Sequence, residues 1–357
     1  MRDTSKFHLL EPTRRLKIAA IQMDAAPAPV DERLERASRL LERAAAQGAQ
    51  IAVLPEVFNT GYTYADENYA LAETADGRTL AWMRTKANQL NLYVAGTLFF
   101  YENGEIYNRM FLVAPDGQDW QYDKFYPWAW ERAYYRKTQG GVSVADTPLG
   151  KFGMLICWDC AHTNLWRQYA GQVDLMLVSS CPPLPHRIRL CFPGGERISV
   201  QELGLIWQVA YQGADDAFGA HLLRQSTWLG VPVVNTTGSG FFQSALPRPR
   251  LSLLTYTLFR PRLWKYLKDA DKVRAETGYF PETYVAAADG TVLQRVTETG
   301  DALVVSEVEL ADETPHPRQK QPAFGMSPLA YFADWLANRL LDGYYRRRVR
   351  AIADRVK

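Results

Sequence analysis

The sequence has no apolar run long enough to span a bilayer, no low-complexity tract and no strong excess of one charge. Its 41 Lys and Arg residues nearly balance its 39 Asp and Glu residues, and the net charge of +2 argues against nucleic-acid binding as the main function. The stretch MRDTSKFHLLEPTRRLK lacks an apolar core of signal-peptide length, so we expect a cytoplasmic location. These absences leave a globular protein of 357 residues, 47% of them hydrophobic, with the size and composition of an ordinary enzyme.

Cysteine is also scarce, since the chain has only Cys157, Cys160, Cys181 and Cys191. Four cysteines are too few for a disulfide scaffold. Cys157 and Cys160 have the C-x-x-C spacing of redox and zinc sites, but no second such pair and no histidine pair lies near them, so we expect no metal. A thioredoxin-like disulfide between the two remains an alternative at this point.

Short apolar runs alternate with amphipathic segments in the first half of the chain. Residues 16–22 and 50–55 have the pattern of buried strands, and residues 31–47 between them have the apolar spacing of a helix. A further helix is expected at 77–90 and a further strand at 92–100. This alternation predicts an α/β fold with a sheet covered by helices.

The same pattern continues through the second half, with two interruptions. Strands are expected at 152–156 and 175–178, a helix at 220–229, and strands at 231–236, 284–288, 292–296 and 302–308. Residues 182–219 and 244–280 fit the pattern poorly, so we expect two long irregular insertions of the kind that form lids, binding loops or interfaces.

We therefore expect a catalytic domain over residues 15–311 with these two insertions, preceded by an extension over 1–14. Residues 312–357 form the expected C-terminal extension, with an amphipathic helix and the basic cluster Arg346, Arg347, Arg348 and Arg350.

Three reactive side chains follow the ends of predicted strands or turns. Cys157 follows the strand 152–156 directly, at a turn into a helix, where backbone N–H groups favour a thiolate and can bind an oxyanion. Glu56 follows the strand 50–55, and Lys124 follows a Pro-Asp-Gly turn. A base, a fixed positive charge and a thiol together suit covalent hydrolysis of an amide-like bond.

The motifs around these residues resemble those of the nitrilase superfamily of carbon–nitrogen hydrolases. LKIAAIQMDAAP is similar to the family's opening strand, AVLPEVFNTGY to its glutamate motif, and YDKFYPWAWERAYYRKTQGG to its lysine motif. GMLICWDCAHTNLWRQYA resembles its nucleophile elbow, and VPVVNTTGSG and VVSEVEL resemble its closing part. The resemblance extends from about residue 16 to about residue 310, with every motif in the family's order.

This resemblance implies a fold and roles for individual residues. The fold is an αββα sandwich that dimerises as αββα–αββα, so a homodimer or higher homo-oligomer is expected. Cys157 is the implied nucleophile, Glu56 the general base and Lys124 the cation that stabilises the oxyanion. Glu131 is the implied second glutamate, which positions substrate and water, and the Trp158 N–H joins the oxyanion hole. No metal or organic cofactor is implied.

The chain departs from the family near the nucleophile, where His162, Thr163 and Asn164 replace a frequent Phe-Pro-Glu. His162 permits an alternative Cys-His mechanism, although Glu56 already supplies a base. We expect Asp159 to hold the turn after Cys157 through hydrogen bonds or an ion pair, and Cys160 to be a spectator.

Aromatic residues gather around the expected reactive groups. We expect Tyr126, Trp128, Trp130, Tyr134 and Trp158 to form a pocket for an apolar or aromatic substrate. The stretch 248–268 mixes Arg and Lys with Leu, Tyr, Phe and Trp, as does the C-terminal helix. Such segments form dimer interfaces, lids or peripheral membrane contacts, of which an interface is the first expectation.

The sequence thus predicts hydrolysis of a carboxamide or N-carbamoyl group through a cysteine thioester, with release of ammonia or an amine. Cys-Trp-Asp at the nucleophile resembles carbamoyl-amine amidohydrolases more than nitrilases. Hydrolysis of a nitrile through a thioimidate is one alternative. An acyltransferase at a membrane surface that uses the same residues is another, and a non-catalytic binding protein is a third.

Overall fold

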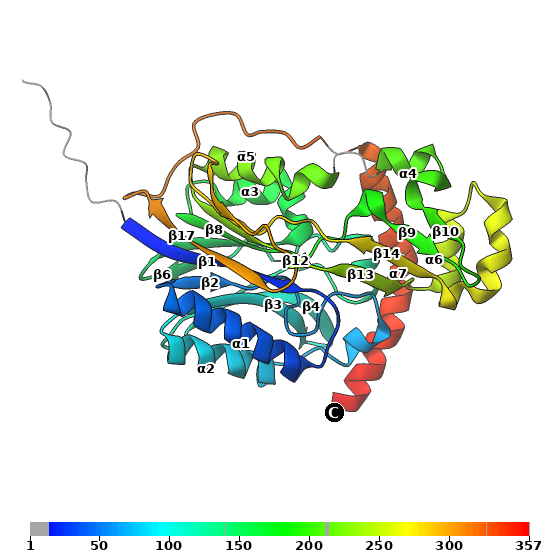
Figure 1. The fold of residues 1–357 in the computed structure, drawn as a ribbon, viewed down its shortest axis with the longest axis horizontal. Helices are drawn as coiled ribbons and strands as arrows, with labels where there is room; N and C mark the ends of the chain where they lie inside the picture. The colour runs from blue at the N-terminus through cyan, green and yellow to red at the C-terminus, as the bar shows by residue number, and fades with distance from the viewer. Residues whose placement is uncertain (1–13, 139, 211–213, 326, 357) are drawn as a thin grey trace, which may run out of the picture.

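The computed structural model describes residues 14–138, 140–210, 214–325 and 327–356. Two stacked sheets lie between two layers of helices, which is the αββα sandwich expected from the sequence (Figure 1). The expected N-terminal extension, apart from Arg14, lies outside the described residues. The αββα–αββα dimer remains a prediction, as do the domain boundaries.

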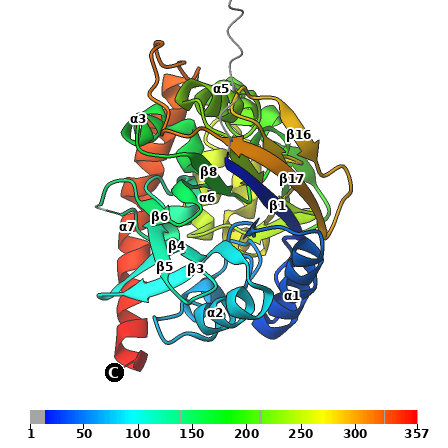
Figure 2. The same cartoon turned by 90° about the vertical axis from the view of Figure 1, so that its left-hand side faces the viewer.

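The first core sheet has the strand order β12-β1-β2-β3-β4-β5, and β17 also pairs with β1. Its strands are β1 (Arg14–Asp24), β2 (Ile51–Val53), β3 (Tyr93–Glu102), β4 (Glu105–Val113), β5 (Asp119–Asp123), β12 (Gly238–Ser239) and β17 (Ala302–Leu310). The helices α1 (Val30–Ala46) and α2 (Arg78–Leu90) cover its outer face (Figures 1 and 2).

The second core sheet has the order β16-β15-β11-β8-β7-β6. Its strands are β6 (Val144–Thr147), β7 (Gly150–Ile156), β8 (Leu175–Ser179), β11 (Val233–Thr236), β15 (Tyr284–Ala286) and β16 (Val292–Arg295). The helices α3 (Thr163–Tyr169) and α5 (Ala220–Leu229) cover its outer face (Figure 1).

The side chains of β1 explain why the core strands are apolar without alternation. Ile18 and Ala20 belong to the core between the sheets, and Ala19 and Ile21 belong to the core beneath α1 and α2. Because successive strand residues point to opposite faces, a strand buried on both faces needs apolar residues at every position. β1 pairs with β2, and β7 pairs with β8, in parallel. Because paired parallel strands run in the same direction, the carboxyl ends of each pair lie side by side.

The two insertions are not irregular, which corrects the expectation from the sequence. They contribute β9 (Arg189–Cys191), β10 (Arg197–Ser199), α4 (Leu205–Ala210), α6 (Pro249–Tyr256) and β14 (Arg274–Gly278). β9, β10 and β14 join β13 (Phe241–Ala245) in a sheet of order β10-β9-β14-β13, which we call the inserted sheet. It extends from one end of the sandwich and carries the 3₁₀ segment η7 (Pro261–Lys272), drawn in yellow in Figure 1.

The C-terminal helix α7 (Pro328–Val356) runs along the side of the molecule (Figures 1 and 2). Its second half packs on the same chain, because Leu341, Tyr345 and Val349 are buried in the same aromatic core as the inserted sheet. Arg348 of the basic cluster pairs with Asp66 at 2.7 Å. No helix in the described ranges is both long enough and apolar enough to cross a bilayer.

Candidate active site

Cys157 lies at the sharp turn between β7 and the 3₁₀ segment η3 (Cys157–Ala161). Its φ of +48° is in the left-handed region, which is rarely occupied by a residue other than glycine. Val57, next to Glu56, and Ala129, two residues before Glu131, also have positive φ values of 45° and 37°. Such strained residues persist where the surrounding structure holds them, and they gather at functional sites.

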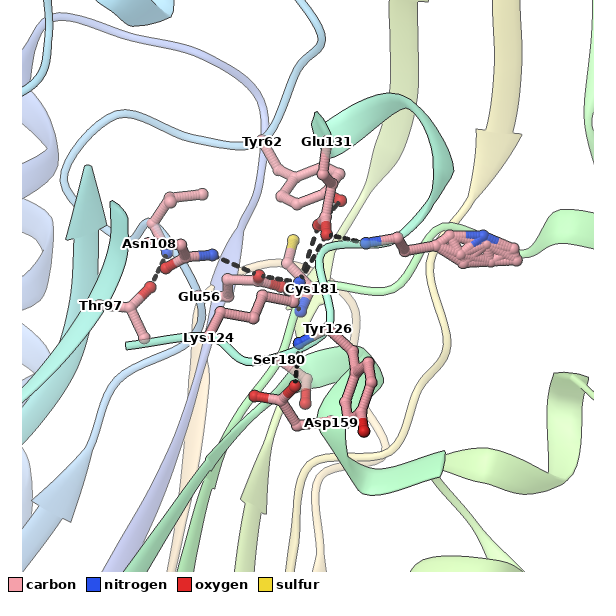
Figure 3. Close-up of polar contacts among 12 residues, drawn as sticks. Glu56, Tyr62, Thr97, Asn108, Lys124, Tyr126, Glu131, Asp159, Ser180 and Cys181 are labelled. Carbon is pink, nitrogen blue, oxygen red and sulfur yellow. Dashed lines mark hydrogen bonds and ion pairs between the residues drawn. The ribbon is translucent and has the colours of Figure 1, made fainter. Parts of the chain in front are cut away.

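Glu56 occupies the loop after β2 and is 2% exposed. Its Oε1 accepts hydrogen bonds from Lys124 Nζ at 2.7 Å and from Asn108 Nδ2 at 2.7 Å, and its Oε2 accepts one from the Cys181 N–H at 3.0 Å. The Cys157 thiol also hydrogen-bonds to this carboxylate. Glu56 therefore contacts the expected cation, as Figure 3 shows, and it also contacts the expected nucleophile Cys157.

Lys124 follows β5 and is fully buried between two carboxylates. Its Nζ lies 2.7 Å from Glu56 Oε1 and 2.8 Å from Glu131 Oε2, and it donates a hydrogen bond to Tyr135 Oη at 3.3 Å. Figure 3 shows the carboxylates of Glu56 and Glu131 both directed at the lysine. A charge buried this deeply is tolerated only when it is paired and hydrogen-bonded, as it is here.

Glu131 lies in the 3₁₀ segment η2 (Ala129–Ala133), and its two oxygens are fully engaged. Oε1 accepts hydrogen bonds from Lys124 Nζ at 2.9 Å and from Tyr62 Oη at 2.6 Å, and Oε2 accepts one from the Trp128 N–H at 2.6 Å. Because α7 packs directly on η2, the C-terminal helix supports the position of this glutamate.

The protonation states follow from burial and from the neighbouring charges. Burial raises the pKa of Glu56 to about 7, against the opposing effect of Lys124. Burial and the Glu56 carboxylate raise the pKa of the Cys157 thiol well above its usual range. Burial alone would lower the pKa of Lys124, but the interactions with Cys157, Glu131 and Glu56 raise it by more, so the pKa lies well above its usual value and Lys124 stays an ammonium. At neutral pH the thiol therefore keeps its proton beside a carboxyl group whose pKa suits a general base.

Asp159 holds the turn after Cys157, as expected from the sequence. Its Oδ2 accepts hydrogen bonds from Tyr122 Oη at 2.8 Å and from the Phe125 N–H at 3.2 Å, and its Oδ1 accepts one from the Tyr126 N–H at 2.7 Å. These bonds tie the nucleophile turn to the loop that carries Lys124 (Figure 3). Asp159 therefore fixes the distance between the two without touching the reactive atoms.

His162 is not placed to serve as the base. Its imidazole stacks on the Tyr126 ring with centroids 3.4 Å apart, and its Nε2 has no hydrogen-bond partner among the described residues. Burial lowers the pKa of His162 to about 3, so it is neutral at physiological pH. Cys157 and Cys160 are both free thiols. Within the described ranges, no group of three or more His, Cys, Asp or Glu side chains could hold a metal ion.

A cavity of about 60 Å³ opens beside Cys157. This is several times the roughly 10–15 Å³ that one water molecule requires. Glu131 and three of the aromatic residues expected from the sequence, Trp128, Trp130 and Trp158, lie in its lining. Tyr126 and Tyr134 do not: Tyr126 stacks on His162, and Tyr134 packs against other tyrosine rings.

Several residues at this site were missed in the sequence. Tyr62 and Tyr64 line the cavity, and Tyr62 donates a hydrogen bond to Glu131. Their position in NTGYTY, a few residues after Glu56, was the available signal. Asn108 gave no signal, because it is one polar residue within β4. Phe242 and Tyr256, from the inserted sheet and α6, complete the cavity from a distant part of the chain.

Comparisons with known proteins identify relatives of this chain. The family model for carbon–nitrogen hydrolases matches residues 17–189. A nitrilase of Pyrococcus abyssi is 29% identical over 147 residues, covering 40% of this chain and 56% of that protein. An omega-amidase of Xenopus laevis is 30% identical over 176 residues, covering 46% of this chain and 62% of that protein. The matched segments thus span a little over half the length of these relatives.

Solved structures extend the similarity of fold over most of the chain. A CN-hydrolase superfamily protein from Xanthomonas campestris has a TM-score of 0.60 at 16% identity, over 84% of this chain and 91% of that one. An amidase from Nesterenkonia sp. has a TM-score of 0.59 at 16% identity, over 85% and 92%. The solved structures show the same fold, and the family match over residues 17–189 together with the curated relatives assigns the chain to the nitrilase superfamily of carbon–nitrogen hydrolases.

Proposed function

We propose that this chain hydrolyses a non-peptide carbon–nitrogen bond, in a carboxamide or N-carbamoyl group, through a thioester on Cys157. The observation that carries the proposal is the hydrogen bond of the Cys157 thiol to Glu56, whose carboxylate is in turn 2.7 Å from the Lys124 ammonium. Relatives named as omega-amidase and N-carbamoylputrescine amidase support this class of reaction.

In the first half-reaction, Glu56 takes the thiol proton as Sγ attacks the carbonyl carbon, and the carbonyl oxygen becomes an oxyanion. Lys124 and the Trp158 backbone N–H stabilise this oxyanion. Glu56 then returns the proton to the departing nitrogen. The carbon–nitrogen bond breaks, and ammonia or an amine leaves the thioester behind.

In the second half-reaction, Glu56 takes a proton from water as the water oxygen attacks the thioester carbon. The carbon–sulfur bond breaks, the thiolate regains the proton, and the carboxylic acid is released. Glu131 keeps Lys124 in place and, with Tyr62, borders the space that substrate and water occupy. One carboxylate thus serves both halves of the cycle.

A nitrile substrate is the alternative within the same site, and relatives named as nitrilases support it. Attack of Sγ on the nitrile carbon would give a thioimidate, which two water molecules convert to the acid and ammonia. A thioimidate adduct seen by intact mass would identify the nitrile reaction, because this adduct retains the nitrogen, whereas an amide gives only the thioester adduct, which has lost it.

The test is intact-mass spectrometry of the protein with a panel of amides, N-carbamoyl compounds and nitriles, with ammonia release measured in parallel. We expect an adduct on Cys157 and ammonia, and neither from the Cys157→Ala variant. Cys160→Ala is the matched control, because Cys160 is another buried thiol of the same segment and should leave both signals intact. Turnover by Cys157→Ala at the native rate would refute covalent catalysis at Cys157. Absence of both adduct and ammonia with every compound of the panel would favour a non-catalytic protein.

We also propose a peripheral membrane contact around η7, in keeping with acyl transfer at a membrane surface as a second function. Leu258, Phe259 and Trp264 are exposed by 52%, 59% and 41%, and the exposed Arg260 and Arg262 lie between them. Exposed apolar residues interleaved with cations suit an anionic lipid surface.

Cosedimentation with phosphatidylglycerol vesicles tests this contact, with phosphatidylcholine vesicles for comparison. Phe259→Ser should weaken binding to the anionic vesicles, whereas Leu293→Ser, at a 40% exposed leucine on β16, should not. Absence of binding to anionic vesicles would overturn the proposal.

A further inference from the structure

The cavity beside Cys157 has almost no charge in its lining, and this restricts what it can bind. Among the lining residues that the structure describes, Glu131 is the only one of the Asp, Glu, Lys, Arg or His types. The remainder are aromatic or aliphatic side chains and the Cys157 thiol. Glu131 is therefore the only charged side chain of the described lining that could pair with a charged group of a substrate.

Glu131 has no capacity left for a substrate. Its Oε1 already accepts hydrogen bonds from Lys124 Nζ at 2.9 Å and Tyr62 Oη at 2.6 Å, and its Oε2 lies 2.6 Å from the Trp128 nitrogen. A substrate ammonium would have to displace Lys124. A substrate carboxylate would face two carboxylates, Glu56 and Glu131, held by a single lysine, so the local charge opposes it.

Most of the remaining lining of the cavity is apolar. Pro182, Pro183, Ile188 and Phe242 belong to it, supplied by the insertions and the inserted sheet. Two of the hydroxyl groups in the lining are already paired, since Tyr62 Oη and Tyr64 Oη lie 3.1 Å apart and Tyr62 Oη donates to Glu131. A charge transferred from water to such a surface loses its hydration without replacement.

We propose that this pocket selects substrates whose acyl group is uncharged and apolar, and that the inserted sheet supplies this selectivity. The inference rests on the proposed hydrolysis and narrows it: amides with a terminal carboxylate or ammonium are poor substrates, and aliphatic or aromatic amides of similar size are good ones.

Two isosteric pairs of amides test the proposal on the native chain. Hexanamide and 5-aminopentanamide differ by a methyl and an ammonium at the same position, and 5-methylhexanamide and glutaramate differ by an isopropyl group and a carboxylate. We expect kcat/KM, followed by ammonia release, to favour the apolar member of each pair by about 100-fold or more, because a buried group left unpaired is strongly rejected.

A substitution on β13 offers a second, independent test. Phe242 is 1% exposed and lines the cavity, whereas its neighbour Phe241 is 58% exposed and points away. Phe242→Arg should raise kcat/KM for glutaramate relative to 5-methylhexanamide by about tenfold or more, because the guanidinium pairs with the carboxylate. Phe241→Arg is the matched control and should leave the ratio unchanged. The comparison of the four amides uses the native chain, so it tests the proposal even if the Phe242→Arg variant does not fold.

The outcomes separate this inference from the function on which it rests. A higher kcat/KM for the apolar amide of each pair supports both the proposed hydrolysis and the proposed selectivity. Ammonia release with equal or better kcat/KM for a charged member would overturn the selectivity while leaving the hydrolase intact. No ammonia from any of the four amides, together with no adduct on Cys157, would overturn the proposed hydrolysis of amides and this inference with it.

Discussion

The catalytic cluster and the pocket next to it come from two regions that are built in different ways. Glu56, Lys124 and Cys157 each follow the end of a core strand, and Glu56 and Lys124 are each held by several hydrogen bonds or ion pairs. The apolar part of the pocket comes from short strands and loops of the inserted sheet, held mainly by ring contacts such as that of Tyr64 with Phe242.

This difference indicates that the cluster determines the chemistry and the inserted sheet determines substrate binding. Polar groups at the edges of a rigid double sheet fix the chemistry, because their positions depend on backbone ladders with many partners. The inserted sheet can change its apolar side chains without disturbing those ladders. We therefore expect substitutions in the cluster to act on kcat, and substitutions in the inserted sheet to act on KM.

The largest loss is expected for Glu56→Gln, which keeps the shape of the side chain and removes the base. We expect kcat to fall by about 10³-fold with little change in KM, because proton transfer by a positioned group contributes on this scale. Steady-state kinetics on an apolar amide measures it. Glu102→Gln, at the surface end of β3, is the control and should leave kcat unchanged. A Glu56→Gln variant with normal kcat would remove Glu56 from the mechanism.

Lys124→Met separates charge from shape in the same cluster. Loss of the ammonium should lower kcat by about 10²- to 10³-fold, since one donor to the oxyanion disappears. It also leaves Glu56 and Glu131 buried beside each other, which should lower the free energy of unfolding by about 3–5 kcal/mol.

Kinetics and denaturant unfolding of the Lys124→Met variant measure the two effects. Lys137→Met, at an exposed lysine beside the Phe125 ring, should show neither. A folded Lys124→Met variant with undiminished kcat would contradict the role of the lysine.

The same two regions differ in how well the sequence predicts them. The strands β1 and β7, the helix α1 and the positions of Glu56 and Cys157 follow from local patterns: apolar runs, helical spacing and a reactive residue directly after a strand. These signals lie within a few residues of each other, so a single pass along the chain finds them.

The inserted sheet has no such signal. β9 and β10 are three residues long, too short for a two-residue alternation to be visible, and β9 pairs with β14, which lies some eighty residues later. The strands exist because of long-range pairing rather than local preference. The same reason hid Asn108, whose role arises only when β4 meets Glu56 in the folded chain.

Phe242→Ala directly tests whether the inserted sheet acts on KM rather than on kcat. Removing the ring should raise KM for an apolar amide by about 10- to 100-fold, the effect of losing the burial of an aromatic side chain, while kcat stays within a few-fold. Stability should also fall, by about 3–5 kcal/mol. Phe241→Ala, on the exposed face of β13, should alter neither quantity. A Phe242→Ala variant with lower kcat and unchanged KM would contradict the proposal that the inserted sheet acts on KM and the cluster on kcat.

The smallest expected effect is a shift in the pH profile, and it concerns how the cluster tunes its base. The pKa of Glu56 is raised to about 7 by burial, so kcat/KM should fall about tenfold per pH unit well below pH 7, where the carboxyl group holds a proton and cannot accept another. Asn108 Nδ2 donates to Glu56 Oε1 at 2.7 Å, and this bond favours the ionised form.

Asn108→Ala removes that donor, so the pKa of Glu56 should rise and the acidic limb of kcat/KM should move to higher pH by about one unit. Asn88→Ala is the control, because Asn88 donates a similar bond to the Pro115 carbonyl at the surface. A merely structural role for Asn108 would lower the melting temperature and leave the limb in place. Movement of the limb, with the Asn88→Ala profile unchanged, would instead identify Asn108 as the residue that sets the working pH of the base.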